Sequence, residues 1–217
     1  MSDEEKKAPD VAKANKDHAW IRKYPDHLKW EDRIEITPLF EMMDKTRQKY
    51  GDRPAFDFLG KKYNWSEIAE LADKLARGLQ NLGIGKNSKV GLFLPNCPMF
   101  IVSFYAITKI GATVVHYNPL YSEKEDSHTD LMITADLKML HDKMLEMLSS
   151  TRLNQLIVCP FTDMLPFPKK TLFKVLKGQE LAKIPDDDRH FPLARVLDND
   201  GVIRAVNIDP YNDVALL

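Results

Sequence analysis

The chain has 217 residues, 44% of them hydrophobic and 29% charged, and its formal net charge at pH 7 is -1. This composition is typical of a globular domain, and the near-zero net charge argues against a nucleic-acid-binding protein, which usually carries a strongly basic face. Residues 1–19 lack the apolar segment of a secretory signal, so we expect a disordered tail before a cytoplasmic domain at 20–217. Cys97 and Cys159 lack metal or redox spacing and are expected to be reduced thiols.

Two helices and a hairpin are predicted in the first third of the domain. Thr37-Pro38 is typical of an N-cap and first turn, and a helix should follow it. Two short strand-like runs, 55–59 and 62–65, flank Gly60-Lys61 and predict a β-hairpin. Ser66 is the expected N-cap of the second helix. The apolar residues that recur at helical spacing along it are Ile68, Leu71, Leu75, Leu79 and Leu82.

A strand–helix–strand unit forms the centre of the sequence. An apolar run at 90–94 and a β-branched run at 113–117 flank an apolar segment of helical length at 99–110. We expect Asn96 to cap this helix and Gly111 to end it in the left-handed conformation. The helix is apolar on nearly every side, and its roughly 12 residues are too few for a membrane span of about 20. It is therefore predicted to lie in the core.

The alternation of strands and helices continues beyond this unit. Strands are expected at 131–134 and 155–159, with a helix between them that is capped by Asp136. The connection at 120–130 is barely long enough for a parallel crossover. This order predicts an α/β fold with a mainly parallel sheet and helices on both faces. The apolar run at 213–217 is expected to be an interior strand of a sheet that continues in a longer protein.

Residues 160–185 interrupt this alternation with a basic amphipathic insertion. Such a helix, with exposed phenylalanines, is suited to the headgroup layer of a membrane. A surface insertion with a solvated lysine face is the alternative, and the sequence leaves both open. The lysines of the insertion are Lys169, Lys170, Lys174, Lys177 and Lys183.

No complete catalytic motif can be recognised from the residues alone. Gly78 and Gly83 have the separation of a phosphate loop, but Ile84 stands where that motif requires lysine. No closely spaced His or Cys set is present, so no metal ligands are predicted. His116 lies at the carboxyl end of a predicted strand, where open α/β sheets bind ligands, although a core histidine is the alternative. These residues predict ligand contacts at strand ends and no catalytic group.

Two short motifs resemble those of the adenylate-forming superfamily, which includes acyl-CoA synthetases, luciferases and peptide-synthetase adenylation domains. YNWSEI at 63–68 is similar to its first core motif, and KIGA at 109–112 followed by Asn118-Pro119 is similar to its second. The similarity extends from about Trp20 to the end of the chain. The aromatic arm at 20–25 and the Asn-Pro-Leu-Tyr segment most resemble bacterial long-chain fatty-acid–CoA ligases.

This resemblance implies a two-step reaction in a full-length enzyme that uses ATP, CoA and Mg²⁺. A fatty acid is first coupled to ATP as an acyl-adenylate, and the CoA thiol then takes the acyl group. The loop after the second strand borders the CoA channel in relatives, which nominates Tyr117, Asn118, Leu120 and Tyr121 as ligand contacts. The family's phosphate loop, Mg²⁺-binding Glu and C-terminal lysine would lie beyond Leu217. We therefore expect no catalytic residue and no activity from these residues alone.

Other interpretations of the sequence remain open. One is a non-catalytic α/β module that binds a partner or a membrane through 160–185 and the N-terminal arm. Another is a ligase for a short-chain or aromatic acid, because much of the acyl pocket would come from residues outside this sequence. An open sheet edge also predicts self-association into a homo-oligomer. No nucleic-acid partner is expected.

Overall fold

The computed structural model describes residues 20–29, 32, 35–117 and 129–217. The predicted tail at 1–19 and most of the short connection at 120–130 lie outside the described residues. Contacts divide the chain into two units, Met1–Ile36 and Thr37–Leu217. In the first unit, the described residues include one turn of 3-10 helix, η2, at Ile21–Lys23. The second unit contains all the elements that follow.

A five-stranded sheet forms the centre of the second unit, in the order β4-β3-β5-β6-β7. Every pair of neighbouring strands is parallel, which confirms the predicted fold class. The last strand was not predicted, because three residues ending in proline give little strand signal; proline is tolerated there at a sheet edge. The strands are β3 Lys89–Phe93, β4 Thr113–His116, β5 Leu131–Ala135, β6 Leu156–Cys159 and β7 His190–Pro192.

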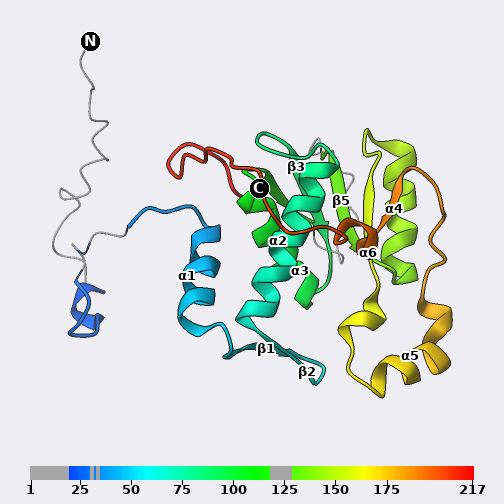
Figure 1. Cartoon of the computed structure of the whole chain (residues 1–217), viewed down its shortest axis with the longest axis horizontal. Helices are drawn as coiled ribbons and strands as arrows, with labels where there is room; N and C mark the ends of the chain where they lie inside the picture. Colours follow the sequence, from blue (N-terminus) through cyan, green and yellow to red (C-terminus); the bar gives the residue numbers. More distant parts are fainter. Residues whose placement is uncertain (1–19, 30–31, 33–34, 118–128) are drawn as a thin grey trace, which may run out of the picture. The chain divides into compact units, whose positions relative to one another are not determined.

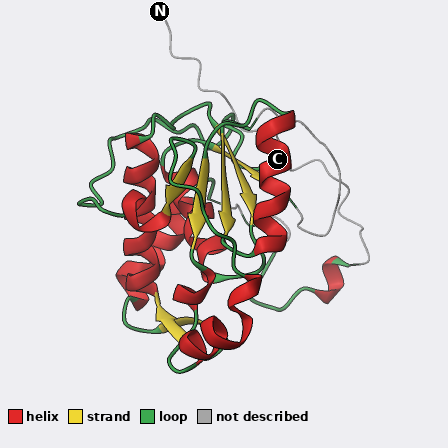
Figure 2. Cartoon of the chain, turned by 90° about the vertical axis from the view of Figure 1, so that its right-hand side faces the viewer, coloured by secondary structure: helices red, strands yellow, loops and turns green. Residues whose placement is uncertain are grey.

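Helices cover both faces of this sheet (Figures 1 and 2). The crossover through α3 leads from β3 to β4, toward one end of the strand order, and the crossover through α4 leads from β5 to β6, toward the other end. Because such crossovers are right-handed, the two helices lie on opposite faces. No helix of the described residues combines the length and apolar character needed to cross a bilayer. The helices are α1 Phe40–Tyr50, α2 Trp65–Asn81, α3 Pro98–Lys109, α4 Lys138–Ser150, α5 Lys169–Lys177 and α6 Leu193–Val196, with 3-10 turns η3 Phe161–Met164 and η4 Gly178–Glu180.

The predicted β-hairpin is confirmed, with its strands one residue earlier in the sequence. The strands β1, Pro54–Phe58, and β2, Lys61–Asn64, pair antiparallel. The two turn residues, Leu59 and Gly60, both have positive φ, at 54° and 96°. This is the backbone form that matches the twist of two-residue hairpins, and glycine adopts it without steric cost.

The predicted N-caps of α1 and α2 are wrong, although both helices are present. Asn64 caps α2 in place of Ser66: its side chain accepts a hydrogen bond from the Glu67 N–H, and the Glu67 carboxylate accepts one from the Asn64 N–H, both at 2.8 Å. This reciprocal capping box forms because β2 keeps Asn64 extended directly before the first helical turn. The cap of α1 is Leu39, without a side-chain hydrogen bond, instead of Thr37-Pro38.

The predicted N-cap of α3 is also wrong, because it is one residue too early. The N-cap is Cys97, which is extended, and no side-chain hydrogen bond caps the helix; Asn96 is exposed in the preceding loop. Pro98 occupies the first helical position, where its missing N–H is not needed. At the other end Gly111 has φ +70°, so the left-handed helix end is confirmed.

A buried cation joins the first three helices of this unit. The Nζ of Lys109, on α3, lies 2.6 Å from Asp44 on α1 and 2.5 Å from Asp73 on α2. The lysine side chain is only 7% exposed. Arg47 adds a second cation, 2.9 Å from the Asp73 carboxylate. The one charged residue of an otherwise apolar helix is thus satisfied by two carboxylates from its neighbours.

The apolar run at 213–217 joins the described sheet beside β4, and its expected interior position in a longer protein stays a prediction. Its backbone runs parallel to β4: the Val114 N–H donates to Ala215 O, and the Leu217 N–H donates to Val114 O, both at 2.9 Å. The side chains of Val214, Leu216 and Leu217 are more than half exposed. The outer hydrogen-bonding groups of β4 are therefore occupied by this segment, and its apolar side chains face solvent.

Candidate functional site

The candidate site is the edge where the parallel strands end. At the carboxyl ends of β3 and β5 the following helices depart to opposite faces, which is the arrangement that opens a ligand crevice in α/β sheets. We define the carboxyl edge as the segments at the carboxyl ends of β3 to β6, residues 94–98, 116–117, 136–137 and 160–161. The chemistry available at this edge depends on which of these side chains are free.

Tyr117 is the predicted ligand contact that the structure describes: its backbone follows the carboxyl end of β4, and its side chain crosses β3 toward Thr129, which precedes β5. Its N–H donates to Leu92 O at 3.1 Å, and its hydroxyl lies 2.7 Å from the hydroxyl of the buried Thr129. Gly91 makes room for the ring, because a Cβ at that position would lie 3.0 Å from Tyr117 Cε2 and would overlap the sulfur of Met132. The ring is therefore fixed by β3, β4 and the entry to β5.

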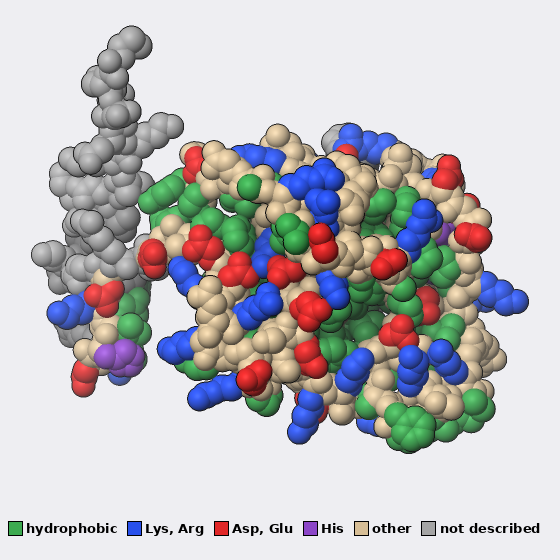
Figure 3. Space-filling view, viewed as in Figure 1, with side chains coloured by type: hydrophobic (Ala, Val, Ile, Leu, Met, Phe, Trp, Pro, Cys, Tyr) green, Lys and Arg blue, Asp and Glu red, His purple; other side chains and the backbone are tan. Residues whose placement is uncertain are grey.

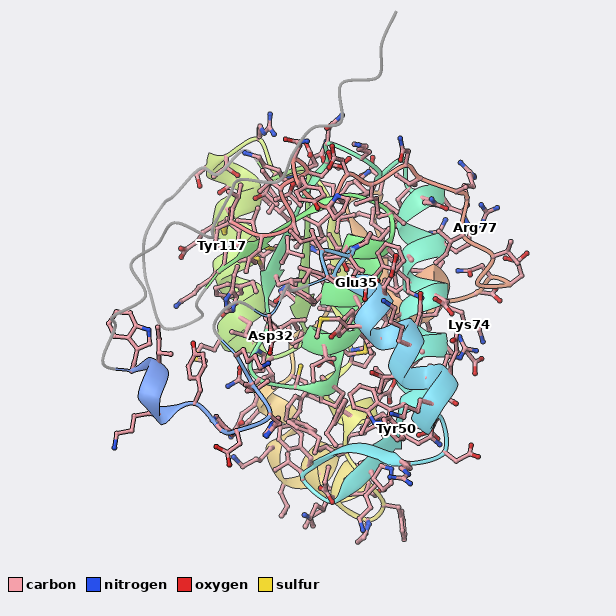
Figure 4. The ribbon with its side chains drawn as sticks, turned by 90° about the vertical axis from the view of Figure 1, so that its left-hand side faces the viewer. Asp32, Glu35, Tyr50, Lys74, Arg77 and Tyr117 are labelled. Atoms are coloured by element: carbon pink, nitrogen blue, oxygen red, sulfur yellow. The ribbon has the colours of Figure 1, made fainter. Side chains whose placement is uncertain are left out.

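The other three predicted contacts, Asn118, Leu120 and Tyr121, lie outside the described residues. Whether they meet Tyr117 stays a prediction. Figure 4 places Tyr117 on the opposite side of that view from Lys74 and Arg77, two basic side chains of α2. These two cations therefore do not contribute to the edge at which Tyr117 lies.

A cavity of about 290 Å³ lies next to the carboxyl edge, between β1 and the first turn of α3. This volume is at the lower limit for pockets that bind small molecules, and such pockets are lined mostly by apolar side chains. His116 borders the same region: it is exposed, and its ring centroid lies 5.1 Å from that of Phe100, so it is a rim histidine and not a core one. The cavity is lined by Phe56, Asp57, Phe58, Asn96, Cys97, Pro98, Phe100 and Ile101.

Sequence reasoning missed this cavity because its two walls are about 40 residues apart in the chain. Each wall has an ordinary local explanation, as a hairpin strand and as a helix start. The signal that could have indicated it is the pair of aromatic residues, Phe56 and Phe58, which flank Asp57 on a short strand. This alternation of aromatic and polar residues predicts that one face of the strand is packed against other residues. Only the tertiary structure shows that this face borders a cavity.

Asp136 has a structural role at this edge that differs from its predicted one. It was expected to cap α4, but the N-cap is Leu137, and the Asp136 carboxylate accepts a hydrogen bond from the Phe161 N–H at 2.7 Å. Its own N–H donates to Cys159 O at 3.0 Å, and its carbonyl accepts from Ala182 at 2.7 Å. Burial raises the pKa of this carboxyl group. Asp136 therefore joins the ends of β5 and β6 instead of capping the helix.

Both cysteines are buried, free thiols close to this carboxylate. Burial raises the pKa of Cys97, and hydrogen bonds from the N–H groups of Phe100 and Met99 offset this increase only in part. Burial raises the pKa of Cys159 well above its usual value, and the nearby Cys97 and Asp136 add to this effect. Because the thiolate is the reactive form, neither cysteine is suited to act as a nucleophile.

The carboxyl edge can bind a ligand, but its described side chains do not form a catalytic set. Within residues 20–29, 32, 35–117 and 129–217 no group of three or more His, Cys, Asp or Glu could hold a metal ion. A larger cavity of about 400 Å³ includes Lys86, Lys89 and Thr113. It lies at the amino ends of β3 and β4, the opposite edge from the crevice expected in this fold class.

The fold is that of the N-terminal part of acyl-CoA synthetases. A long-chain-fatty-acid–CoA ligase from Archaeoglobus fulgidus has a similar structure, with a TM-score of 0.63 and 22% identity over 85% of this chain and 34% of that one. Coronafacic acid ligase from Pectobacterium brasiliense gives a TM-score of 0.65 and 19% identity over 83% of this chain and 33% of that one. At these identities the comparison establishes the fold alone.

The sequence identifies the family. The profile of the AMP-binding enzymes matches residues 43–193, and the chain belongs to this family, as its two motifs indicated. The long-chain-fatty-acid–CoA ligase of Bacillus subtilis is 30% identical over 207 residues, which cover 91% of this chain and 37% of that protein. The enzyme of the same name from Yersinia pestis is 31% identical over 111 residues, 50% of this chain and 20% of that protein. The chain therefore spans 37% of the first relative and 20% of the second.

Proposed function

We propose that this chain is the N-terminal portion of a ligase that activates a fatty acid with ATP and transfers it to CoA. The observation that carries this proposal is the similarity to a fatty-acid–CoA ligase over 91% of the chain. That similarity includes the hairpin, the central β3–α3–β4 unit and the basic insertion together, and is not confined to one motif. It favours a fatty acid over a short-chain or aromatic acid.

The proposed reaction has two steps. A carboxylate is a poor electrophile, so its oxygen first attacks the α-phosphorus of ATP, which forms the acyl-adenylate and releases pyrophosphate. The CoA thiol then attacks the activated carbonyl, and AMP leaves as the thioester forms. Mg²⁺ would offset the charge of the phosphates. The described residues contain no cluster suited to hold it, so we assign no step of the reaction to a metal site in this part of the chain.

Binding and positioning are the roles that we assign to the residues of this chain. We propose that Tyr117, Asn118, Leu120 and Tyr121 contact the CoA or nucleotide at the carboxyl edge. The position of Tyr117 directly after β4, with its N–H bonded to Leu92 O, supports this proposal because open α/β sheets bind ligands at the carboxyl ends of their strands.

We further propose that the 217 residues are inactive by themselves. The buried thiols and the hydrogen-bonded Asp136 offer no nucleophile or general base. In the family, a Gly/Ser/Thr-rich phosphate loop follows a strand like the one at 213–217. Leu217 O accepts a hydrogen bond from the His116 N–H, so a loop that followed it in a longer protein would begin beside Tyr117. The catalytic lysine would come from a later domain.

The test is acyl-CoA formation by the complete product of the gene, with whatever it encodes after Leu217. Each of palmitate, acetate and benzoate is supplied with ATP, Mg²⁺ and CoA, and the thioester is measured by chromatography. We expect a palmitoyl thioester. Product from acetate or benzoate alone would instead establish the short-chain or aromatic alternative, and no product with any acid would favour a non-catalytic module.

Two finer features also remain proposals. Self-association through the sheet edge predicts a concentration-dependent mass in light scattering, and a monomer at all concentrations would contradict it.

A surface-binding role in addition to ligation is favoured by one observation, the apolar side chains that α5 exposes to solvent.

A further inference from the structure

The helix α5 exposes an apolar stripe that nothing in the described structure covers. Leu172, Val175 and Leu176 recur at the spacing of one helix face, and they are 54%, 75% and 67% exposed. Phe167, shortly before the helix, is 86% exposed. We call these four residues the apolar stripe. A contiguous group of large apolar side chains marks an interaction surface more often than single exposed residues do.

The exposure of the apolar stripe does not result from a loosely attached helix. The Phe173 ring, on the side of α5 next to the apolar stripe, packs against that of Phe161 with centroids 5.2 Å apart. The Nζ of Lys169 donates a hydrogen bond to Leu59 O in the β1–β2 turn at 2.7 Å. These contacts hold α5 to the rest of the domain with its apolar stripe outward.

The surroundings of the apolar stripe are positively charged. Residues 160–185 contain five lysines and two carboxylates, whereas the whole chain has a net charge of -1. Those carboxylates are Asp163, which lies 2.7 Å from Lys170, and Glu180, which lies 3.2 Å from Lys177. Such exposed pairs are weak and leave the lysine side chains free to adjust. The insertion therefore carries three more positive than negative side chains.

The view in Figure 3 agrees with this arrangement. Apolar side chains gather at the lower right, where Figure 1 places α5, and basic side chains border them. The acidic run 186–188 lies elsewhere, because β7 enters the sheet with His190 beside Leu156, the first residue of β6. These aspartates are thus near the amino ends of the strands, whereas α5 follows the carboxyl end of β6.

We propose that α5 docks the protein onto the anionic surface of a phospholipid bilayer. The helix would lie in the plane of the membrane, with the apolar stripe at the boundary between headgroups and acyl chains and the lysines beside lipid phosphates. A protein partner is less well matched, because lysine is depleted in protein–protein interfaces. One short helix gives weak, reversible binding that depends on the charge of the lipid.

The docked orientation also has a consequence that rests on the proposed ligase function. Because α5 follows the carboxyl end of β6, docking would bring the carboxyl edge of the sheet toward the leaflet in which fatty acids dissolve. The membrane proposal itself needs no enzymatic activity, so its test measures binding alone.

The test is co-sedimentation of the 217-residue protein with two kinds of vesicle, phosphatidylcholine alone and phosphatidylcholine mixed with phosphatidylglycerol. We expect binding to the mixed vesicles only. Raising the salt from about 0.1 M to about 1 M shortens the screening length from about 10 Å to about 3 Å and should release the protein. No sedimentation with mixed vesicles at low salt, or equal binding to neutral vesicles, would overturn the proposal.

Variants separate the two parts of the surface. Leu172→Gln with Val175→Gln should reduce the partition coefficient more than tenfold, because two buried apolar side chains are lost. Lys174→Gln should reduce it about fivefold, the effect of one basic residue near an anionic surface. Matched controls on α1, Met42→Gln and Lys45→Gln, also change exposed side chains and should leave binding unchanged.

Folding and self-association are checked on the same variants. Circular dichroism should be unchanged, since every altered side chain is exposed. An equal loss of binding in the α1 controls would overturn the proposal. So would a protein that self-associates without vesicles and becomes monomeric with Leu172→Gln and Val175→Gln, because a second copy would then be what covers the apolar stripe.

Discussion

Lys109 is the residue whose replacement tests the packing of this fold most sharply. It belongs to the KIGA motif at 109–112, and the structure places its ammonium group between the carboxylates of Asp44 and Asp73. Lys109→Met keeps most of the apolar stem and removes the charge. Breaking a buried pair by removing one partner typically costs about 3–5 kcal/mol, because the other charge stays desolvated.

The structure places the expected cost at the lower end of this range. Asp73 keeps Arg47 at 2.9 Å, and the Asp44 side chain is 35% exposed, so water can solvate part of the remaining charge. We therefore expect Lys109→Met to lower the free energy of unfolding by about 3 kcal/mol. Urea denaturation followed by circular dichroism measures this value.

A matched control lies on α2. Lys74 pairs with Glu70 at 3.0 Å on the helix surface, and because such exposed pairs contribute little, Lys74→Met should leave the free energy of unfolding nearly unchanged. Equal effects of the two substitutions, or a loss below about 1 kcal/mol for Lys109→Met, would refute the reasoning that burial makes the difference.

Two further predictions concern stability. Gly78→Ala should destabilise the fold by about 1–3 kcal/mol despite alanine's better helix propensity, because a Cβ would overlap the α6 backbone. The control Gly178→Ala should be neutral or slightly stabilising, because a Cβ at that position meets open space. Thermal unfolding compares the two variants. Burial and the neighbouring His190 lower the pKa of His141 below 6.5, so the unfolded chain binds more protons and stability should fall as the pH drops below about 6.5. His141→Leu should flatten this dependence in urea titrations at several pH values, and an unchanged slope would contradict the assignment.

Much of the fold could be predicted because its signals are local. The β3–α3–β4 unit follows from apolar runs of strand and helix length, and its end follows from Gly111, whose positive φ few other residues tolerate. The N-caps failed for a reason that is not local. Asn96 and Asp136 are suitable caps by type, but one is exposed in a loop and the other bonds to the N–H of Phe161, 25 residues further on.

The site was less accessible to sequence reasoning than the fold. Tyr117 could be nominated from the family resemblance, and strand order places it at the expected edge. The cavity beside Cys97 depends on a contact between the hairpin and α3 that neither segment encodes alone. The partners of Lys109 likewise come from two helices earlier in the chain. Residue type and spacing indicate which groups are available, and tertiary contacts decide which of them are free.

Fatty-acid-dependent exchange of pyrophosphate into ATP, measured on the 217-residue protein alone, tests the central claim most directly. The claim is that these residues form a ligand-binding edge without the groups that activate a carboxylate. We predict no exchange above background with palmitate, ATP and Mg²⁺, at protein concentrations where circular dichroism confirms the fold. Exchange that requires palmitate would contradict the account, because the 217 residues would then contain the catalytic machinery that we assign to the rest of a longer enzyme.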